Sequence, residues 1–391
     1  MRLQEFQGKQ LLSGHGIAIP DGVIAEKANE AATAARQLGP GRVYVKAQCL
    51  AGNRAAAGGV RVAHSATEAE AAARALIGQR LVTSQTGPGG EPIRTVLIER
   101  GVAAVDELYL ALGIDATAAE ITVAAARSGG TAVESRLPVT SASPLIKMKL
   151  GVSEERAADA IAAFCRKLDL PNEPTDSLCA VIRRLHRAFV QSDASFIEIN
   201  PLALTEAGTW VAIDVKVALD DNAAFRHPDP SNSRAEDETD PSELKAQHYQ
   251  INFIHMDGDI GTVVNGAGLG LATLDMVYAA GGAPANFMDI RTTAKSLDIA
   301  QGVVLVLHNP RVKVLLVNIF GGGMQPCDTI IEGIGIAFRR HPRKLPLVLR
   351  IAGNNEDLAR ARLANFPLVK IECSDMWQAV TRAVAIARER L

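Results

Sequence analysis

The clearest pattern of apolar and polar positions lies between residues 195 and 216. Apolar residues dominate two runs, Ser195–Leu204 and Trp210–Lys216, and the intervening Thr205–Thr209 contains a glycine. Two such runs joined by a short glycine-containing loop predict a β-hairpin. The alternation within the first run places Glu198 and Asn200 on one face of this hairpin.

Three oxygen-bearing side chains of the hairpin, Glu198, Asn200 and Asp214, are therefore expected to converge, with Phe196 and Ile197 in apolar surroundings. Oxygen ligands suit Mg²⁺, which takes one or two protein carboxylates and completes its coordination with water and phosphates. The hairpin is thus a candidate metal site. The alternative is an edge hairpin whose polar face only contacts water, because acids are common on solvated strand faces.

The chain before this hairpin carries both helical and extended patterns. Apolar residues recur at helical spacing in some segments and alternate in others, with glycine and proline at the ends. The expected helices are residues 3–13, 28–38, 67–77, 153–168 and 178–190, and the expected strands are 22–25, 43–47, 95–99, 105–112 and 120–126. Together with the hairpin they predict an α+β unit.

Residues 227–241 are rich in proline and acid and poor in apolar residues, which predicts a domain boundary or an exposed connection. Beyond this segment the pattern becomes a regular alternation. The expected strands are 261–264, 285–290, 312–319, 347–351 and 369–371, and the expected helices are 271–280, 294–307 and 327–338. Repeated βαβ units predict a parallel, doubly wound sheet that binds ligands beyond the carboxyl ends of its strands.

Composition narrows the class of protein. The 391 residues are 48% hydrophobic and 4% aromatic, which is enough for two or three α/β domains with proper cores. The formal charge of −2 argues against a nucleic-acid surface or a polybasic membrane patch. Five widely spaced cysteines without zinc spacing indicate reduced thiols, and neither a signal peptide nor an apolar run of membrane-spanning length is present. We expect a soluble cytoplasmic protein whose partners are small molecules or proteins.

The strand that ends near Lys46 is followed by a loop of small residues, 49–62. Small residues let backbone N–H groups approach a phosphate, and Lys46 and Arg54 could supply positive charge. The Walker pattern is absent, and an ordinary hairpin loop is the alternative. Glu99 and Glu107 stand at strand boundaries, where a carboxylate can accept hydrogen bonds from a ribose or an adenine amino group. Most exposed glutamates have no such role.

Two glycine-rich turns, Asn265–Gly270 and Gly321–Gly323, each follow an expected strand and open an expected helix. The first only weakly resembles a dinucleotide fingerprint, so we discount a nicotinamide cofactor. Backbone N–H groups at a helix N-terminus instead predict a site for a phosphate or carboxylate.

Several motifs occur in a fixed order along the chain. They are Glu5–Leu12, Val45–Lys46, Ala51–Gly52, Arg54, Ala57–Val60, Arg80–Thr83, Glu107–Leu110, Glu198–Leu202, Asp221–Ala223, Asn265–Leu269 and Val317–Gly322. In residue type and spacing they resemble the β subunit of succinyl-CoA synthetase over essentially the whole chain. The resemblance implies an ATP-grasp nucleotide-binding domain over residues 1–240 and a flavodoxin-like CoA-ligase domain over residues 245–391.

The resemblance also implies roles for individual residues. Those matching nucleotide-binding positions are Lys46, Asn53, Arg54, Ala55, Glu99, Val102 and Glu107, and those matching the Mg²⁺ ligands are Asn200 and Asp214. Glu198 matches an acid that orients a phosphorylated histidine. The positions matching the site for the organic acid are Asn265, Gly322, Gly323 and Met324.

The family implies ATP or GTP and CoA as cosubstrates, a small dicarboxylic acid, and an α subunit that carries the active-site histidine and most of the CoA site. None of the eight histidines here matches that position. The resemblance leaves open which acid is used, whether ATP or GTP is preferred, and whether the complex is a heterodimer or a heterotetramer.

The chain departs from the family pattern at three places. Gly52–Ala56 lacks two glycines and a lysine of the family's Gly-Gly-Arg-Gly-Lys, Arg291–Thr293 replaces three glycines, and Gly322–Asp328 replaces Gly-Gly-Ile-Val-Arg-Cys-Asp. Arg291 could recognise a second carboxylate or obstruct the site. Three hypotheses follow: a β subunit of an acid–CoA ligase, a stand-alone ATP-grasp ligase, and a degenerate, non-catalytic regulatory subunit.

Overall fold

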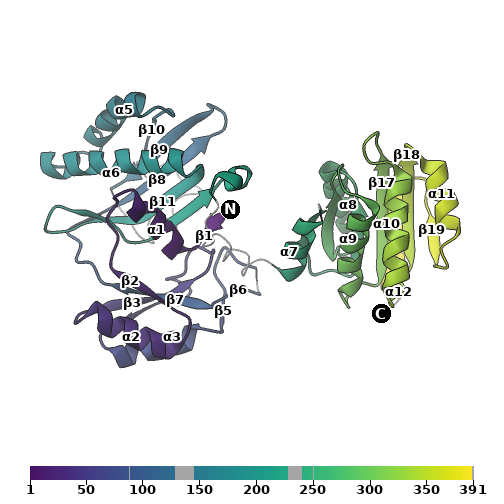
Figure 1. Ribbon diagram of the computed structural model, residues 1–391, viewed down its shortest axis with the longest axis horizontal. Coiled ribbons are helices and arrows are strands. Elements are labelled where there is room, and N and C mark those ends of the chain that lie inside the picture. Colours follow the sequence, from purple (N-terminus) through teal and green to yellow (C-terminus); the bar gives the residue numbers. More distant parts are fainter. Residues whose placement is uncertain (88, 128–144, 228–239, 250, 390–391) are drawn as a thin grey trace. The chain divides into compact units, whose positions relative to one another are not determined.

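The computed structural model describes residues 1–87, 89–127, 145–227, 240–249 and 251–389. The chain forms two compact units, Met1–Glu238 and Thr239–Leu391, and each is described by itself (Figure 1). The proline- and acid-rich segment predicted as a connection lies mostly outside the described residues, since only 227, 240 and 241 of it are described.

The larger sheet of the first unit is antiparallel and contains the predicted hairpin. Its order is β1-β13-β11-β8-β9-β10, and β12 also pairs with β11. The strands are β1 (Arg2–Leu3), β8 (Asp106–Asp115), β9 (Glu120–Ala126), β10 (Ile146–Lys149), β11 (Ala194–Leu204), β12 (Trp210–Ala212) and β13 (Val215–Leu219). The hairpin is confirmed, because β11 pairs antiparallel with both β12 and β13.

Three helices lie on this sheet: α1 (Glu5–Gly14), α5 (Glu154–Arg166) and α6 (Asn172–Gln191). Helix α6 places Leu178, Ile182 and Leu185 on one side, at intervals of four and three residues, and all three are fully buried. They share a core with Ile197 and Ile199 of β11. A short 3₁₀ helix, Asp221–Arg226, follows β13.

A second, smaller sheet of this unit has the order β2-β7-β3-β4. Its strands are β2 (Gly22–Ala25), β3 (Val43–Gln48), β4 (Val60–Ala63) and β7 (Thr95–Arg100), and a separate pair is formed by β5 (Arg80–Leu81) and β6 (Glu91–Pro92). Helices α2 (Ala28–Leu38) and α3 (Ala66–Leu76) contact each other and this sheet. Their buried faces are mostly alanine, which has no side chain beyond Cβ, so the two helices can approach closely.

The second unit contains one sheet of order β14-β16-β15-β17-β18-β19. The strands are β14 (Ile251–His255), β15 (Ile260–Val264), β16 (Asn286–Ile290), β17 (Val314–Gly321), β18 (Leu347–Gly353) and β19 (Lys370–Glu372). The five strands β15 to β19 are parallel and follow the flavodoxin-like order 2-1-3-4-5. The predicted parallel, doubly wound sheet is confirmed, and one further edge strand, β14, pairs antiparallel with β16.

Helices cover both faces of this sheet. They are α7 (Pro241–His248), α8 (Ala267–Ala279), α9 (Ser296–His308), α10 (Cys327–Arg340), α11 (Glu356–Ala364) and α12 (Met376–Glu389). Alternate residues of β17 enter different cores: Val314 and Leu316 pack with α12, and Leu315 and Val317 pack with α9 and α10. Strand β17 is therefore buried on both sides, which explains its continuous apolar sequence.

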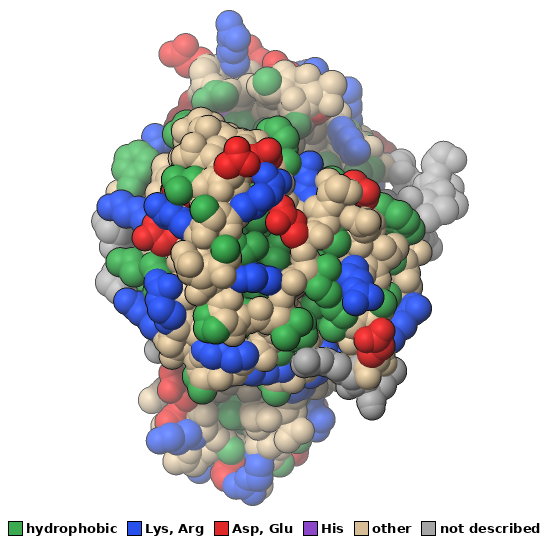
Figure 2. Space-filling model, turned by 90° about the vertical axis from the view of Figure 1, so that its right-hand side faces the viewer, with side chains coloured by type: hydrophobic (Ala, Val, Ile, Leu, Met, Phe, Trp, Pro, Cys, Tyr) green, Lys and Arg blue, Asp and Glu red, His purple; other side chains and the backbone are tan. Residues whose placement is uncertain are grey.

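No helix in the described part of the chain is long and apolar enough to cross a membrane. On the side of the molecule seen in Figure 2, basic side chains are spread among hydrophobic, polar and acidic ones and do not gather in one patch.

Candidate functional site

A buried cluster of charged side chains lies where α1, β3, β7 and the turn before β13 meet. Its members are Glu5, Lys9, Lys46, Arg54, Glu99 and Asp214. All have side chains at most 7% exposed except Asp214, which is 33% exposed. Three positive and three negative groups are thus gathered in one place, and their formal charges cancel.

Glu5, at the start of α1, is the centre of this charged cluster. Its Oε1 accepts hydrogen bonds from Nζ of Lys9 at 2.8 Å and Nζ of Lys46 at 2.9 Å, and its Oε2 accepts from Nη2 of Arg54 at 2.7 Å. Glu99 also accepts hydrogen bonds from both lysines, and its distance to Nζ of Lys46 is 2.6 Å. One carboxylate of the first helix therefore links the two basic residues predicted to bind phosphate.

Arg54 and the lysines are also held by backbone carbonyls. Arg54 Nη1 donates to the carbonyl of Ala47 at 2.8 Å, and the carbonyl of Ile213 accepts from Lys9 at 2.7 Å and from Lys46 at 2.8 Å. Nη2 of Arg54 donates in addition to Oδ1 of Asp214 at 2.8 Å. Each cation thus has at least two oxygen partners, which offsets the cost of burying it.

The pKa values follow from burial and these contacts. Burial raises the pKa of Glu5, but Lys46, Lys9 and Arg54 together outweigh it and hold that pKa well below its ordinary value. Burial acts to lower the pKa of Lys46 and of Arg54, and their acidic neighbours overcome it, so both are raised. Both basic groups therefore stay charged at neutral pH and can face an anion.

The loop after β3 is ordered by the segment that contains β5 and β6. The backbone N–H of Gly52 donates to Oε1 of Gln85 at 2.9 Å, and that of Ala51 donates to Oε2 of Glu91 at 3.0 Å. Asn53 has a left-handed backbone, with φ of 58°, and its side chain donates to Ser84 Oγ at 2.6 Å. Asparagine tolerates this conformation better than most residues, which suits a position where the related pattern has glycine.

Ala55 follows in the same turn and is exposed. The sequence predicted that N–H groups of this loop would face a phosphate, but those of Ala51 and Gly52 already have side-chain partners. The basic side chains of the charged cluster, rather than these two N–H groups, are therefore the clearest anion-binding feature here.

Three of the residues predicted to bind nucleotide line one cavity of about 370 Å³ in the first unit. Glu99, Val102 and Glu107 are among its walls, together with Tyr44 and Ile213. Glu99 and Ile213 also bind Lys46, so the charged cluster forms part of the boundary of this cavity.

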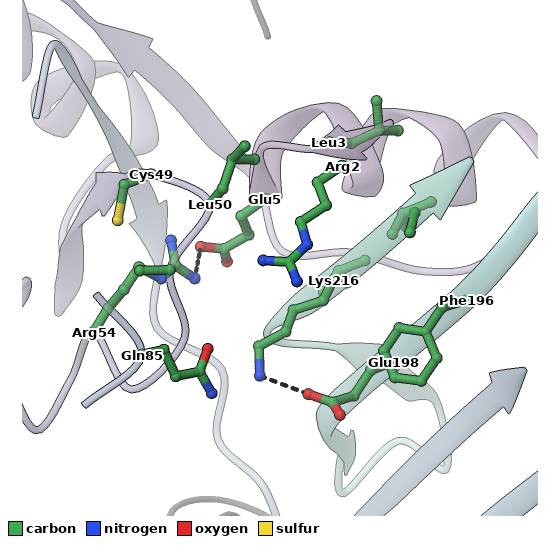
Figure 3. A pocket seen from close by; sticks show the side chains of 14 residues that line it. Arg2, Leu3, Glu5, Cys49, Leu50, Arg54, Gln85, Phe196, Glu198 and Lys216 are labelled. Atoms are coloured by element: carbon green, nitrogen blue, oxygen red, sulfur yellow. Dashed lines mark hydrogen bonds and ion pairs between the residues drawn. The ribbon is translucent and has the colours of Figure 1, made fainter. Parts of the chain in front are cut away.

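Glu198 lies at a second cleft of about 240 Å³, which is bordered by Glu5 and Arg54 on one side and by β11 and β13 on the other (Figure 3). Its carboxylate accepts from Lys216 Nζ at 2.6 Å and from the Tyr109 hydroxyl at 3.1 Å. Lys216 lies directly opposite Glu198 in the pairing of β11 with β13.

Phe196 also lines this cleft and is 37% exposed, which corrects the expectation that it lies in apolar surroundings. The reason is the alternation of the strand. Phe196 and Glu198 are two residues apart and share a face, whereas Ile197 and Ile199 point into the core and are fully buried.

The predicted metal ligands Asn200 and Asp214 are neighbours, because the N–H of Asn200 donates to the carbonyl of Asp214 at 2.9 Å. Within the described ranges, no group of three or more His, Cys, Asp or Glu side chains could hold a metal ion. One carboxylate and one amide still fit Mg²⁺ that is shared with nucleotide phosphates. Glu198, the third residue expected here, is held by Lys216 and Tyr109.

In the second unit the two glycine turns follow the adjacent parallel strands β15 and β17. The side-chain amide of Asn265 donates to the carbonyl of Phe320 at 2.7 Å and accepts from its N–H at 2.9 Å. The N–H of Gly266, at the start of α8, donates to Oδ1 of Asp289 at 2.6 Å. One N–H group at the N-terminus of α8 is therefore already bound to a carboxylate of the chain itself.

The turn before α10 is open, as is the start of α8. A Cβ added at Gly322 or Gly323 would meet nothing within 4 Å, and Met324 is 72% exposed.

Arg291 is positioned by Asn252, whose Oδ1 accepts hydrogen bonds from Arg291 Nε at 3.1 Å and Nη2 at 3.0 Å.

Four residues of the first unit were not predicted as site residues: Glu5, Lys9, Tyr109 and Lys216. One signal was present in the sequence. Glu5 and Lys9 are four residues apart, the spacing of a helical ion pair, but the sequence does not show that this pair is buried.

Comparisons with known proteins agree with this architecture. A family model described as an ATP-grasp domain matches residues 2–204, and one described as CoA-ligase matches residues 263–383. The β subunit of ADP-forming succinate–CoA ligase from Anaeromyxobacter dehalogenans is 39% identical, covering 99% of this chain and 100% of that protein. The corresponding subunit from Desulfosudis oleivorans is 40% identical, covering 99% of both.

Among solved structures, ATP citrate lyase from Methanothrix soehngenii in complex with citrate and coenzyme A has a similar fold. The TM-score is 0.75 at 16% identity, and the match covers 98% of this chain and 99% of that one.

The fold and the site define an ATP-grasp protein joined to a CoA-ligase domain, that is, an acid–CoA ligase of the ADP-forming type. Within that class, the chain belongs to the family of succinate–CoA ligase β subunits.

Proposed function

We propose that this chain is the nucleotide-using β subunit of a ligase that makes an acyl-CoA from succinate or a related dicarboxylic acid, with ATP or GTP and CoA as cosubstrates. Residues 1–240 would bind Mg²⁺ and the nucleotide, and residues 245–391 would form the CoA-ligase domain. The observation that carries this proposal is the buried charged cluster, in which Lys46 contacts Glu99 and Ile213 of the 370 Å³ cavity and Glu5 joins Lys46 to Arg54.

In this proposal, Lys46 and Arg54 bind the phosphate oxygens of the nucleotide, while Glu99 and Glu107 accept hydrogen bonds from its base or ribose. The turn Asn53–Ala55 borders the phosphates. Asn200 and Asp214 would hold Mg²⁺, which neutralises phosphate charge when bound. The protein contributes mainly positioning and charge stabilisation, and the buried contacts of Glu5 fix the two basic side chains before the substrate arrives.

The acid's carboxylate is proposed to bind at the N-terminus of α10, at Gly322, Gly323 and Met324. The open space at both glycines supports this position. Asn265 acts there by holding the backbone of Phe320 next to that turn.

Transfer of a phosphoryl group between nucleotide and acid requires a carrier, and we propose a histidine on an α subunit that also carries most of the CoA site. Glu198 would orient that histidine, since it lies at an open cleft bordered by Arg54. Apolar residues exposed near the glycine turns, Leu271 at 59% and Phe320 at 56%, support a protein partner on this part of the second unit.

We propose the cytoplasm as the location. None of the five cysteines forms a disulfide and all are buried, which suits a reducing compartment.

The test combines the chain with its α subunit and measures acyl-CoA formation with a panel of dicarboxylates, using ATP and GTP in turn. We expect negligible product from the chain alone, activity when both subunits are present, and transient phosphate on the α subunit's histidine. Robust acyl-CoA formation by this chain alone would contradict the proposal and favour a stand-alone ligase. Mg-ADP bound as tightly by Asp214→Ala as by the parent would remove the metal assignment.

A further inference from the structure

The proposed metal ligand and the proposed phosphate ligand are bound to each other. Oδ1 of Asp214 accepts from Nη2 of Arg54 at 2.8 Å, and the same nitrogen donates to Oε2 of Glu5 at 2.7 Å. One guanidinium nitrogen therefore bridges two carboxylates, one at the centre of the charged cluster and one at its partly exposed edge.

We propose that Arg54 exchanges Asp214 for a nucleotide phosphate when Mg²⁺ binds, so that metal and nucleotide bind as a coupled pair. This inference rests on the proposed function, in which Asp214 holds the metal and Arg54 the phosphate.

The contacts of Arg54 permit this exchange. When Mg²⁺ binds Asp214, Arg54 retains two other hydrogen-bond acceptors. They are Oε2 of Glu5, at 2.7 Å, and the carbonyl of Ala47, at 2.8 Å. Its charge is therefore never left uncompensated in the interior, a state that would be strongly unfavourable. The N–H released from Asp214 becomes available to an oxygen at the exposed edge of the cluster, where Asp214 is 33% exposed.

Charge balance explains the coupling. The three positive and three negative groups of the cluster already cancel, so a metal ion alone must displace Arg54 and adds unbalanced positive charge. A nucleotide alone must draw Arg54 away from Asp214 and leaves that carboxylate without its cation. When both ligands bind, Asp214 pairs with the metal and Arg54 with the phosphate. Each ligand should therefore strengthen the binding of the other by the same factor.

The exchange predicts that replacing Arg54 strengthens metal binding and weakens nucleotide binding. A structural defect would weaken both. The probes are Mn²⁺ alone, followed by electron paramagnetic resonance, and ADP alone, followed by calorimetry. In Arg54→Gln we expect Mn²⁺ to bind about tenfold more tightly, because its competitor is gone, and ADP to bind at least about tenfold more weakly.

In Asp214→Asn, which preserves the shape of the side chain, we expect metal binding to be lost and metal-free ADP to bind more tightly, since Arg54 is released. The matched control is Arg187→Gln on α6, which breaks an exposed Arg–carboxylate pair of 2.9 Å to Glu154 on α5. Neither dissociation constant should change in this control.

Weaker binding of both Mn²⁺ and ADP by Arg54→Gln would overturn the exchange and assign Arg54 a purely structural role. Unchanged Mn²⁺ affinity in Arg54→Gln, with intact Mg-ADP binding by the parent, would also overturn the exchange and leave the proposed function standing. Failure of the parent chain to bind Mg-ADP at all would refute the proposed function and the exchange with it.

Discussion

Replacing Glu5 by glutamine tests whether the charged cluster stabilises the first unit. The substitution keeps the size of the side chain and removes the negative charge that contacts Lys9, Lys46 and Arg54 at 2.7–2.9 Å. The Glu5 side chain is only 1% exposed, so water cannot replace the lost partner. Removing one partner from a buried ion pair costs about 3–5 kcal/mol, and we expect Glu5→Gln to lower the free energy of unfolding by that amount.

The assay can be restricted to the first unit, because the chain contains only two tryptophans and each unit has one. Trp377 is 49% exposed on α12, and Trp377→Phe leaves Trp210 as the single reporter. Trp210 is 2% exposed, and its indole N–H donates to the carbonyl of Pro174 at 3.1 Å. Trp210 fluorescence during urea unfolding gives the midpoint and the slope, and their product gives the free energy of unfolding.

A matched control is Glu70→Gln. Glu70 pairs with Arg74 at 2.6 Å on the surface of α3, a distance similar to those in the cluster, but its side chain is 32% exposed and that of Arg74 is 71% exposed. Exposed pairs contribute less than about 1 kcal/mol, so this substitution should have little effect. Equal losses in Glu5→Gln and Glu70→Gln, or a loss below about 1 kcal/mol in Glu5→Gln, would refute our account of the cluster.

The contribution of Glu5 to the free energy of unfolding should depend on pH. The pKa of Glu5 is lower in the folded protein than its ordinary value of 4.5, so the unfolded chain binds more protons between these two values. The contribution of Glu5 is therefore present above pH 4.5 and is lost as the pH falls through its folded pKa. The difference in stability between the parent and Glu5→Gln should shrink in this acidic range.

Further substitutions test local geometry. At Asn53, with φ of 58°, replacement by alanine should cost about 1 kcal/mol more than replacement by glycine, measured by Trp210 fluorescence, and equal costs would contradict the left-handed backbone. Gly335→Ala places a Cβ in steric conflict with the ring of Phe366, so we expect a loss of about 1–3 kcal/mol by calorimetry. Gly268→Ala, where a Cβ meets nothing within 4 Å, should cause no loss. All five cysteines are buried, so an aromatic disulfide reagent should label none in the native protein and five in urea.

Elements with strong periodicity were predictable from the sequence. The bounds of β2, α2 and β9 are those predicted, because glycine, proline or charged residues mark their ends. Helix α7 and strand β14 were missed because both are short and they follow a polar segment, and α11 and α12 were missed at the end of the alternating pattern. The pairing of β14 with β16 depends on contacts that sequence periodicity does not report.

The site was predictable only in part. The resemblance identified Lys46, Arg54 and Glu99 as candidate site residues. No pattern predicted that Glu5 is buried among them, since a charged residue on an amphipathic helix ordinarily faces water. The contact of Arg54 with Asp214 joins residues 160 positions apart, a separation at which local patterns carry no information.

The contacts of Asn265 also bear on the chemical ageing of the protein. An asparagine followed by glycine is prone to lose its side-chain amide, because the unhindered glycine nitrogen attacks the side-chain carbonyl, and asparagine is accordingly a thermolabile residue. Here both reacting groups are engaged: Phe320 binds both ends of the Asn265 amide, and the Gly266 N–H donates to Asp289 at 2.6 Å. The fold therefore protects this pair from deamidation. A carboxylate at position 265 would have no N–H to donate, and the contact that joins the two glycine turns would lose its bond to the Phe320 carbonyl.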